Sequence, residues 1–222
     1  MAAGERSKAL PFEPNPPSLD GSLVGDVGFD PFGFSTVDIT RHFNNVFGKD
    51  MGIAPLTWLR EAELMHGRIC QVAVVGMIAP SLFGTLPGSE WTGVDAYSNT
   101  NPIEAITQVP VLAVIQIIAF MSYLEVRRIG IILEEGSNYM PGDSRFGQGP
   151  GRYNPFKFNY SPEEYAEKQL QELKHCRLSM LGFLGLYLQA VNSGVGIGDQ
   201  LGQALSVPDY YGKAGYFFPE GI

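Results

Sequence analysis

The sequence is short of the residues on which several classes of protein depend. Only 17% of its 222 residues are charged, whereas charged residues make up about 25% of an average soluble domain. It has two cysteines, Cys70 and Cys176, which are too few for a disulfide framework, and we expect both to be small buried apolar residues. The formal net charge of −8 would repel the phosphates of a nucleic acid. These shortages, in a chain that is 45% hydrophobic, argue against a disordered chain, a disulfide scaffold and a nucleic-acid binder.

Charge is also missing from three long stretches of the chain. The stretches without Asp, Glu, Lys or Arg are 69–89, 105–124 and 178–198. Each is close to the length of roughly 20 residues that a membrane-spanning helix needs. The sequence therefore predicts an all-α membrane protein with three transmembrane helices.

We divide the chain into three parts on this basis. Residues 1–54 are rich in Gly, Pro and Asn and are expected to form an extended arm without the apolar run of a signal peptide. Residues 55–198 form the three-helix domain, and residues 199–222 form a tail. The expected spans are about 56–86, 110–135 and 162–192.

The basic residues predict the orientation of these spans. Of the 15 Lys and Arg residues, 14 lie before or at the start of the first span, or between the middle of the second span and the start of the third. The remaining one, Lys213, lies beyond the third span. Loops rich in Lys and Arg stay on the side of the membrane from which helices are inserted. We therefore expect the N-terminus and the loop around 136–160 on one side, and the C-terminus on the other.

Local signals predict where the helices begin and end. Ser161 is a good N-cap, with Pro162 suited to the first turn of the third long helix. Asn101 and Pro102 give a similar start to the middle helix, and Pro110 should kink it or separate a short helix from the span. The aromatic tail SVPDYYGKAGYFFPEGI suits a membrane interface, with a short amphipathic helix as a further expectation.

An internal repeat stands at the start of two apolar runs. The segments 63–68 and 172–177 both read E-L-x-H-x-R. A related loop precedes each of them, GFDPFGFS at 28–35 and RYNPFKFNY at 152–160. The repeat predicts that the first and third spans form an inner pair related by a pseudo-twofold axis, with the middle span to one side.

The charges within the repeat predict contacts between the two helices. Glu and His at i and i+3 lie on one helix face, while the Arg at i+5 lies on another. Uncompensated charges are costly inside a membrane, and the first and third spans run in the same direction. We therefore expect Glu63 to pair with Arg177, and Arg68 to pair with Glu172.

Three interpretations of the repeat remain open at this point. A purely structural lock explains the Glu and Arg residues but leaves the matched His66 and His175 unexplained. A di-iron site would need two more carboxylates, such as Glu125 with Glu104 or Glu134, and the arginines would repel it. Single metals in large apolar cofactors such as chlorophyll account for every residue type. Each magnesium takes one axial ligand, and an arginine cancels the charge of a Glu ligand.

The same residues carry a family resemblance. The segments GDVGFDPFGF, LREAELMHGR and QELKHCRLSMLGF, with the three-span layout, resemble the chlorophyll-binding light-harvesting complex family over about residues 18–222. The opening SKALPFEPNPPSLDG and the KHCRLSM segment look most like its red-lineage branch, which includes fucoxanthin-chlorophyll-type antennae.

The resemblance implies an antenna protein of the chloroplast thylakoid membrane, with a stromal N-terminus and a lumenal C-terminus, and no enzymatic activity. The implied pigments are chlorophyll a, with chlorophyll c as a candidate accessory pigment, and xanthophylls of the fucoxanthin, diadinoxanthin or alloxanthin type. The implied partners are photosystem I, with photosystem II as the alternative, and neighbouring antenna subunits. Thylakoid lipids surround the protein, and a lipid is a further candidate for a bound molecule. A photoprotective relative that dissipates energy is the alternative function.

The resemblance also implies roles for individual residues. Arg68, Arg177 and Arg128 match arginines that pair with glutamate ligands. The family's last ligand, a His in the C-terminal helix, has no counterpart after His175. The loop residues that match carotenoid-holding positions are Asp30, Pro31, Phe32, Asn154 and Pro155, with Asn replacing Asp in the second loop. The positions that match axial ligands of chlorophyll magnesium are Glu63, His66, Glu125, Glu172, His175 and Gln189, with Gln116 at a less regular spacing.

Overall fold

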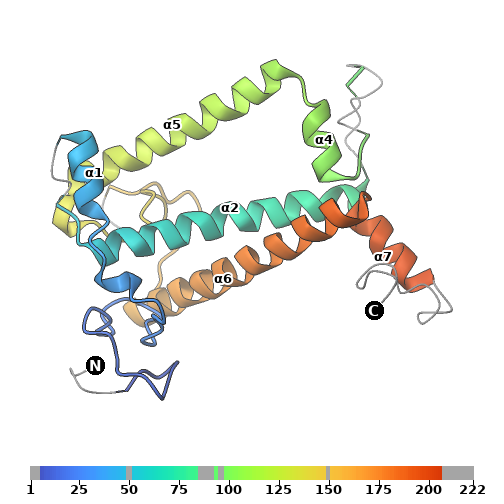
Figure 1. Cartoon of the computed structure of the whole chain (residues 1–222). Helices are drawn as coiled ribbons and strands as arrows, with labels where there is room; N and C mark the ends of the chain where they lie inside the picture. Colours follow the sequence, from blue (N-terminus) through green and yellow to red (C-terminus); the bar gives the residue numbers. More distant parts are fainter. Residues whose placement is uncertain (1–5, 49–51, 85–92, 95–97, 149–150, 207–222) are drawn as a thin grey trace. The chain divides into compact units, whose positions relative to one another are not determined.

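The computed structural model describes residues 6–48, 52–84, 93–94, 98–148 and 151–206. These residues are mostly helical, and no β-strand occurs among them. Figure 1 shows three long helices: α2 (Pro55–Phe83), α5 (Val111–Glu135) and α6 (Pro162–Ser193). The shorter elements are η1 (Phe34–Thr36), α1 (Thr40–Phe47), α4 (Pro102–Gln108), η3 (Gly136–Asn138) and α7 (Ile197–Ser206).

The chain divides into two compact units. The first unit comprises Met1–Arg68 and Ser122–Arg177, and the second comprises Ile69–Met121 and Leu178–Ile222. Both copies of the E-L-x-H-x-R repeat belong to the first unit. The site is therefore built from the first unit.

The start of α6 follows from its capping residues, as predicted. The Ser161 Oγ accepts a hydrogen bond from the Glu164 backbone N–H at 3.2 Å, and the Ser161 N–H donates to Glu164 Oε2 at 2.9 Å. This reciprocal arrangement is a capping box, which satisfies two N–H groups that would otherwise lack partners. The helix ends before Gly194, whose φ of 67° is left-handed.

The middle segment is divided at Pro110, as the sequence predicts. Asn101 Oδ1 accepts from the Ile103 N–H at 3.0 Å and caps α4. Pro110 follows α4 and precedes α5, and the axes of the two helices differ by 108°. α5 then continues to Glu135, and η3 follows at Gly136.

Length and hydropathy single out some of these helices as candidate membrane spans. Among the described residues, α2 is by itself long and apolar enough to cross a membrane. α4 and the segment Val111–Asn138 meet the same requirement only when they are taken together as one bent pair. α6 does not meet it. Its charge-free part within the helix, from Leu178 to Ser193, is shorter than one full span.

Two short helices, α1 and α7, lie outside the predicted spans. The arm is not extended throughout, because α1 lies within it. α7 lies in the Gly-rich segment before the aromatic tail, and residues 207–222 of that tail lie outside the described part. α7 forms where it does because the Gly198 N–H donates to Ser81 Oγ at 3.0 Å and Thr100 Oγ1 donates to Asp199 Oδ2 at 3.2 Å.

The core of the first unit consists of two small clusters. Leu64 of α2 packs with Leu173 and Cys176 of α6, so equivalent positions of the repeat meet each other. Cys176 is buried as expected, whereas Cys70 is only half-buried. The second cluster joins the 53–58 segment to α5 and the residue after η3, and its members are Ile53, Ile131, Ile132, Tyr139 and the partly buried Trp58.

Candidate functional site

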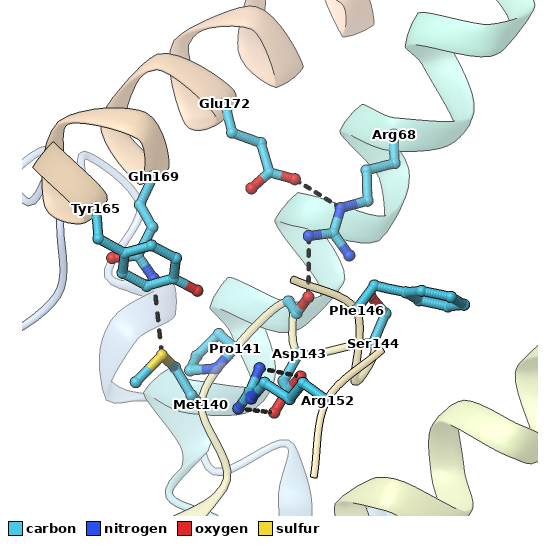
Figure 2. Close-up of a pocket in the computed structure, with 11 residues that line it drawn as sticks. Arg68, Met140, Pro141, Asp143, Ser144, Phe146, Arg152, Tyr165, Gln169 and Glu172 are labelled. Atoms are coloured by element: carbon cyan, nitrogen blue, oxygen red, sulfur yellow. Dashed lines mark hydrogen bonds and ion pairs between the residues drawn. The ribbon is translucent and has the colours of Figure 1, made fainter. Parts of the chain in front are cut away.

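Two ion pairs join α2 to α6 within the first unit. Arg68 Nε lies 2.7 Å from Glu172 Oε1, and Arg177 Nε lies 2.7 Å from Glu63 Oε1. Figure 2 shows the Arg68–Glu172 pair, with the two side chains extending from their helices toward each other. These are the two pairs that the repeat predicts.

The two pairs differ in their surroundings. Glu63 has a second cation, because Arg60 Nε lies 3.0 Å from its Oε2. The same Arg60 donates to the Val24 carbonyl of the arm. The equivalent position on α6 is Gln169, which is uncharged and contacts Met140 Sδ at 3.7 Å instead. Among the described residues, Glu172 is therefore held by one arginine and Glu63 by two. Arg60 was not among the site residues predicted from the sequence.

The two histidines of the repeat are held in the same way. His66 Nδ1 lies 2.7 Å from the Ala62 carbonyl, and His175 Nδ1 lies 2.7 Å from the Gln171 carbonyl. A carbonyl only accepts hydrogen bonds, so Nδ1 carries a proton, and in the neutral imidazole Nε2 therefore keeps its lone pair. Both side chains are exposed. This is the arrangement in which a histidine can bind a metal through Nε2, and the residues present thus fit a magnesium centre.

On α5, Arg128 holds Glu125 through two nitrogens. Arg128 Nε donates to Glu125 Oε2 at 3.0 Å, and Nη2 donates to Oε1. The side chain of Glu125 is 47% exposed, so the carboxylate remains open on one side. The third nitrogen of Arg128, Nη1, lies 3.1 Å from Glu61 Oε1. Glu61 was not among the site residues predicted from the sequence, and the signal that could have found it is the charged run Arg60-Glu61-Ala62-Glu63.

The two predicted glutamine ligands lie in the second unit. Gln189 on α6 and Gln116 on α5 are both exposed. In the part of the chain that the structure describes, neither side-chain amide makes a hydrogen bond. Their oxygens are therefore available to a ligand, although no second protein group orients them.

The two related loops have matching hydrogen bonds. Asp30 Oδ1 accepts from the Phe34 N–H at 2.9 Å, and Asn154 Oδ1 accepts from the Phe158 N–H at 3.0 Å. The second oxygen of Asp30 accepts from the Ser35 N–H at 2.8 Å. Asn154 has an amide there, and its Nδ2 donates to the Phe158 carbonyl at 2.7 Å. The change from Asp to Asn therefore preserves one contact and replaces the other.

The loops share their backbone and aromatic geometry as well. Gly33 has a φ of 71°, and its counterpart Lys157 has a φ of 53°, which is unusual for a residue other than glycine. Phe32 and Phe34 lie 5.8 Å apart in a tilted arrangement, like Phe156 and Phe158 at 5.6 Å. Each loop thus presents exposed phenylalanine rings.

Hydrogen bonding stabilises the ionised form of Asp30 in the first loop. Partial burial acts to raise the pKa of Asp30, but hydrogen bonds from Ser35, and from the Phe34 and Gly33 N–H groups, together outweigh it. The pKa therefore lies below the ordinary value of 3.8. Asp30 is a carboxylate at neutral pH and can keep accepting both backbone N–H groups.

A polar cavity of about 170 Å³ lies beside the Arg68–Glu172 pair. Figure 2 shows that Arg152 and Asp143 form a second ion pair in its wall, through Arg152 Nη1 and Asp143 Oδ1 at 2.6 Å. The two arginines and two acids of the lining are paired. The other lining residues are Met140, Pro141, Gly142, Ser144, Phe146, Tyr165 and Gln169.

The geometry does not support a di-iron site. Among the described residues, no three or more His, Cys, Asp or Glu side chains come together to hold a metal ion. Glu63, Glu125 and Glu172 are each engaged by arginine. Glu134 is paired with Arg145.

The long helices also present large apolar side chains outward. Surface of this kind needs a membrane or bound apolar molecules to cover it. Examples in the second unit are Val72 and Val75 of α2, Val111 and Phe120 of α5, and Leu181 and Leu188 of α6.

The sequence pattern of the family described as "Chlorophyll A-B binding protein" matches residues 15–191. The chain belongs to this family. Its members are light-harvesting proteins with a three-helix membrane fold and are not enzymes.

Three plant relatives illustrate the similarity. The chain is 32% identical over 217 residues to chlorophyll a-b binding protein 4, chloroplastic, of Arabidopsis thaliana, covering 92% of this chain and 75% of the relative. It is 32% identical to photosystem I chlorophyll a/b-binding protein 3-1, chloroplastic, of the same plant, covering 80% and 67%. It is 33% identical to chlorophyll a-b binding protein 8, chloroplastic, of Solanum lycopersicum, covering 80% and 67%.

Proposed function

We propose that this protein is an antenna subunit that binds chlorophyll and carotenoid and passes excitation energy to photosystem I. The observation that carries the proposal is the symmetric arrangement at the α2–α6 contact. Each helix there offers an arginine-paired glutamate and a histidine with a free Nε2. Chlorophyll, when bound, supplies the light absorption and the excited state. The protein's own part is to fix the ligand atoms on rigid helices.

The proposed axial ligands of chlorophyll magnesium divide into two chemical groups. Neutral ligands need no partner charge, whereas a carboxylate adds a negative charge that an arginine must compensate in a membrane. Arg68, Arg177 and Arg128 stand in the places where such compensation is needed. The neutral group comprises His66, His175, Gln189 and Gln116, and the carboxylates are Glu63, Glu125 and Glu172.

The two related loops are the proposed holders of carotenoid end groups. Support comes from their shared hydrogen bonds and from the exposed rings of Phe32 and Phe156. Pro31 and Pro155, which follow the polar residue in each loop, are exposed too. We propose xanthophylls here, with chlorophyll a as the main chlorophyll, chlorophyll c as a candidate accessory pigment and a lipid as a further ligand.

The proposed partner and location are supported by the similar proteins and by the charges. Two of the similar Arabidopsis thaliana proteins carry photosystem I in their names, which supports photosystem I over photosystem II. We place the protein in the thylakoid membrane beside other antenna subunits, with the basic N-terminal side in the stroma. The arm at 1–54, the helical domain at 55–198 and the tail at 199–222 remain our proposed division, and the red-lineage branch our proposed placement.

The first test is the absorption spectrum of the native protein, with pigment extraction from the same sample. Chlorophyll and carotenoid at a fixed ratio to protein are expected, and the extract shows whether chlorophyll c is present. A colourless protein would overturn the proposal.

The second test asks which photosystem is the partner, and whether the protein harvests light or dissipates energy. We expect the protein to sediment with photosystem I, and its pigments to appear in the excitation spectrum of photosystem I fluorescence. Sedimentation with photosystem II alone would overturn this partner. A strongly shortened fluorescence lifetime in the assembled state would instead indicate a photoprotective protein that dissipates energy.

A further inference from the structure

The most deeply buried carboxylate of the described residues is not among the proposed ligands. Glu61 of α2 is 1% exposed. Its place in the repeat is taken on α6 by Leu170, so it is not part of the pseudo-symmetric arrangement. A buried carboxylate is costly unless it is fully paired and hydrogen-bonded. Glu61 must therefore be explained by what it contacts.

One oxygen of Glu61 holds Arg128 of α5. Glu61 Oε1 accepts from Arg128 Nη1 at 3.1 Å, while the Nε of the same guanidinium donates to Glu125 Oε2 at 3.0 Å. Trp58 lies against the guanidinium, 5.6 Å from ring centroid to Cζ. A guanidinium is planar, so contacts at Nη1 and at Nε together fix its plane. Glu61 on α2 therefore fixes the orientation of Arg128, and Arg128 in turn fixes the orientation of Glu125.

The other oxygen of Glu61 binds the segment after η3. Glu61 Oε2 accepts from the Tyr139 hydroxyl at 2.8 Å and from the Gly142 N–H at 2.6 Å. The Gly142 carbonyl in turn accepts from Arg68 Nη2 at 2.9 Å, and Arg68 pairs with Glu172. A continuous set of hydrogen bonds therefore connects Glu125 on α5 with Glu172 on α6, and Glu61 is its centre.

We propose that Glu61 is a positioning residue for the pigment site at Glu125, acting through Arg128. The proposal rests on the proposed function, since it takes Glu125 to be a chlorophyll ligand. The direct ion pair between Arg128 and Glu125 would hold the two side chains together without Glu61. Glu61 adds a fixed orientation and a second negative charge beside the ligand. It therefore affects the geometry and the absorption energy of that one site rather than whether the pigment binds.

The test compares refolded, pigment-loaded variants by pigment count, low-temperature absorption and circular dichroism. Glu125→Leu defines the absorption band of the site, because it should remove one chlorophyll while Arg128 keeps Glu61 as a partner. Glu61→Gln has the same shape but no charge. We expect it to keep the wild-type chlorophyll count and to shift the band that Glu125→Leu removes, leaving the other bands in place. Tyr139→Phe is the matched control, since it removes one hydrogen bond to Glu61 without changing its charge.

The possible results separate the two proposals. If Glu125→Leu removes one chlorophyll but Glu61→Gln leaves its band unmoved, the role of Glu61 is overturned and the ligand assignment stands. If Glu61→Gln lowers the occupancy of all sites together, or Tyr139→Phe produces the same band shift, Glu61 has a general structural role and the inference is overturned. If Glu125→Leu keeps every chlorophyll, the ligand assignment fails and the inference fails with it.

Discussion

Gly67 of α2 and Cys176 of α6 approach each other so closely that no side chain fits between them at Gly67. A Cβ placed on Gly67 would lie 2.2 Å from the Cβ of Cys176 and 2.8 Å from its Cα. The two residues occupy the same position in the repeat, so the pseudo-symmetric helices meet at equivalent points. Small residues allow such close packing of helices in membranes.

Gly67→Ala should therefore destabilise the assembled protein. The new methyl group meets backbone as well as side chain, so the helices must separate, and overpacking of this kind costs about 1–3 kcal/mol. The measurement is the thermal midpoint of the loss of pigment circular dichroism. Gly76→Ala is the control on the same helix, because nothing lies within 4 Å of a Cβ there. Equal midpoints for the two variants would contradict the packing role of Gly67.

The unequal surroundings of the two glutamates predict unequal effects of removing their arginines. Arg177→Leu leaves Glu63 with Arg60, whereas Arg68→Leu leaves Glu172 without an arginine and also removes the bond to the Gly142 carbonyl. Since the side chains of Arg68 and Glu172 are about one-third exposed, we expect a loss of roughly 1–3 kcal/mol for Arg68→Leu, below that for a fully buried pair. Arg177→Leu should lose less. Refolding yield with pigments measures both, and the reverse order would show that Arg60 does not compensate Glu63.

His66→Leu should remove one chlorophyll with little unfolding. Its side chain is exposed, and among the described residues its one polar contact is to the Ala62 carbonyl of its own helix, so the helix does not depend on it. His66→Asn keeps a neutral ligand atom and should retain more of the pigment. Chlorophyll per protein after extraction is the measurement, and an unchanged ratio in His66→Leu would count against His66 as a ligand.

The first loop should loosen in acid. The pKa of Asp30 is lower in the folded loop than its ordinary value of 3.8, chiefly because hydrogen bonds from Ser35 and the Phe34 N–H outweigh partial burial. A depressed pKa means that the ionised carboxylate stabilises the loop at pH values above 3.8, and that this contribution is lost as the pH falls through the lower, folded-state pKa. Cleavage by an acid-active protease such as pepsin, followed at decreasing pH, measures the opening.

Asp30→Asn is the control for this prediction. Asn154 shows that an amide can hold the equivalent loop without titrating. We therefore expect the variant to be cleaved somewhat faster than the wild type at pH 5, by an amount corresponding to about 1 kcal/mol, with a weaker further change in acid. Identical acid profiles for the two proteins would show that Asp30 does not control the loop.

Short-range signals predicted much of the helical structure. The capping residues around Ser161 and Asn101 set the starts of α6 and α4, and Pro110 separates α4 from α5. Capping and proline effects act within a few residues, so they can be read without knowing the fold. The position of α7 could not be read from the sequence, because its contacts with Ser81 and Thr100 come from parts of the chain about 100 residues away.

The same distinction applies to the site. The repeat identified the partners of Glu63 and Glu172, because a charged residue in an apolar helix needs an opposite charge at a matching level. Neither Arg60 nor Glu61 stood out, since both belong to a charged run that also suits an exposed helix face. Glu61 becomes buried only when α5 and the segment around Gly142 pack over it.

The sequence by itself determined the family, the helical character and the residues that can serve as ligands, because these depend on composition, spacing and local motifs. The tertiary structure alone decided which carboxylates are held by one arginine and which by two. It also decided that Gly67 is a packing residue and that Glu61 links three elements of the first unit. These properties depend on contacts between residues far apart in the chain, whose distances and burial no local pattern records.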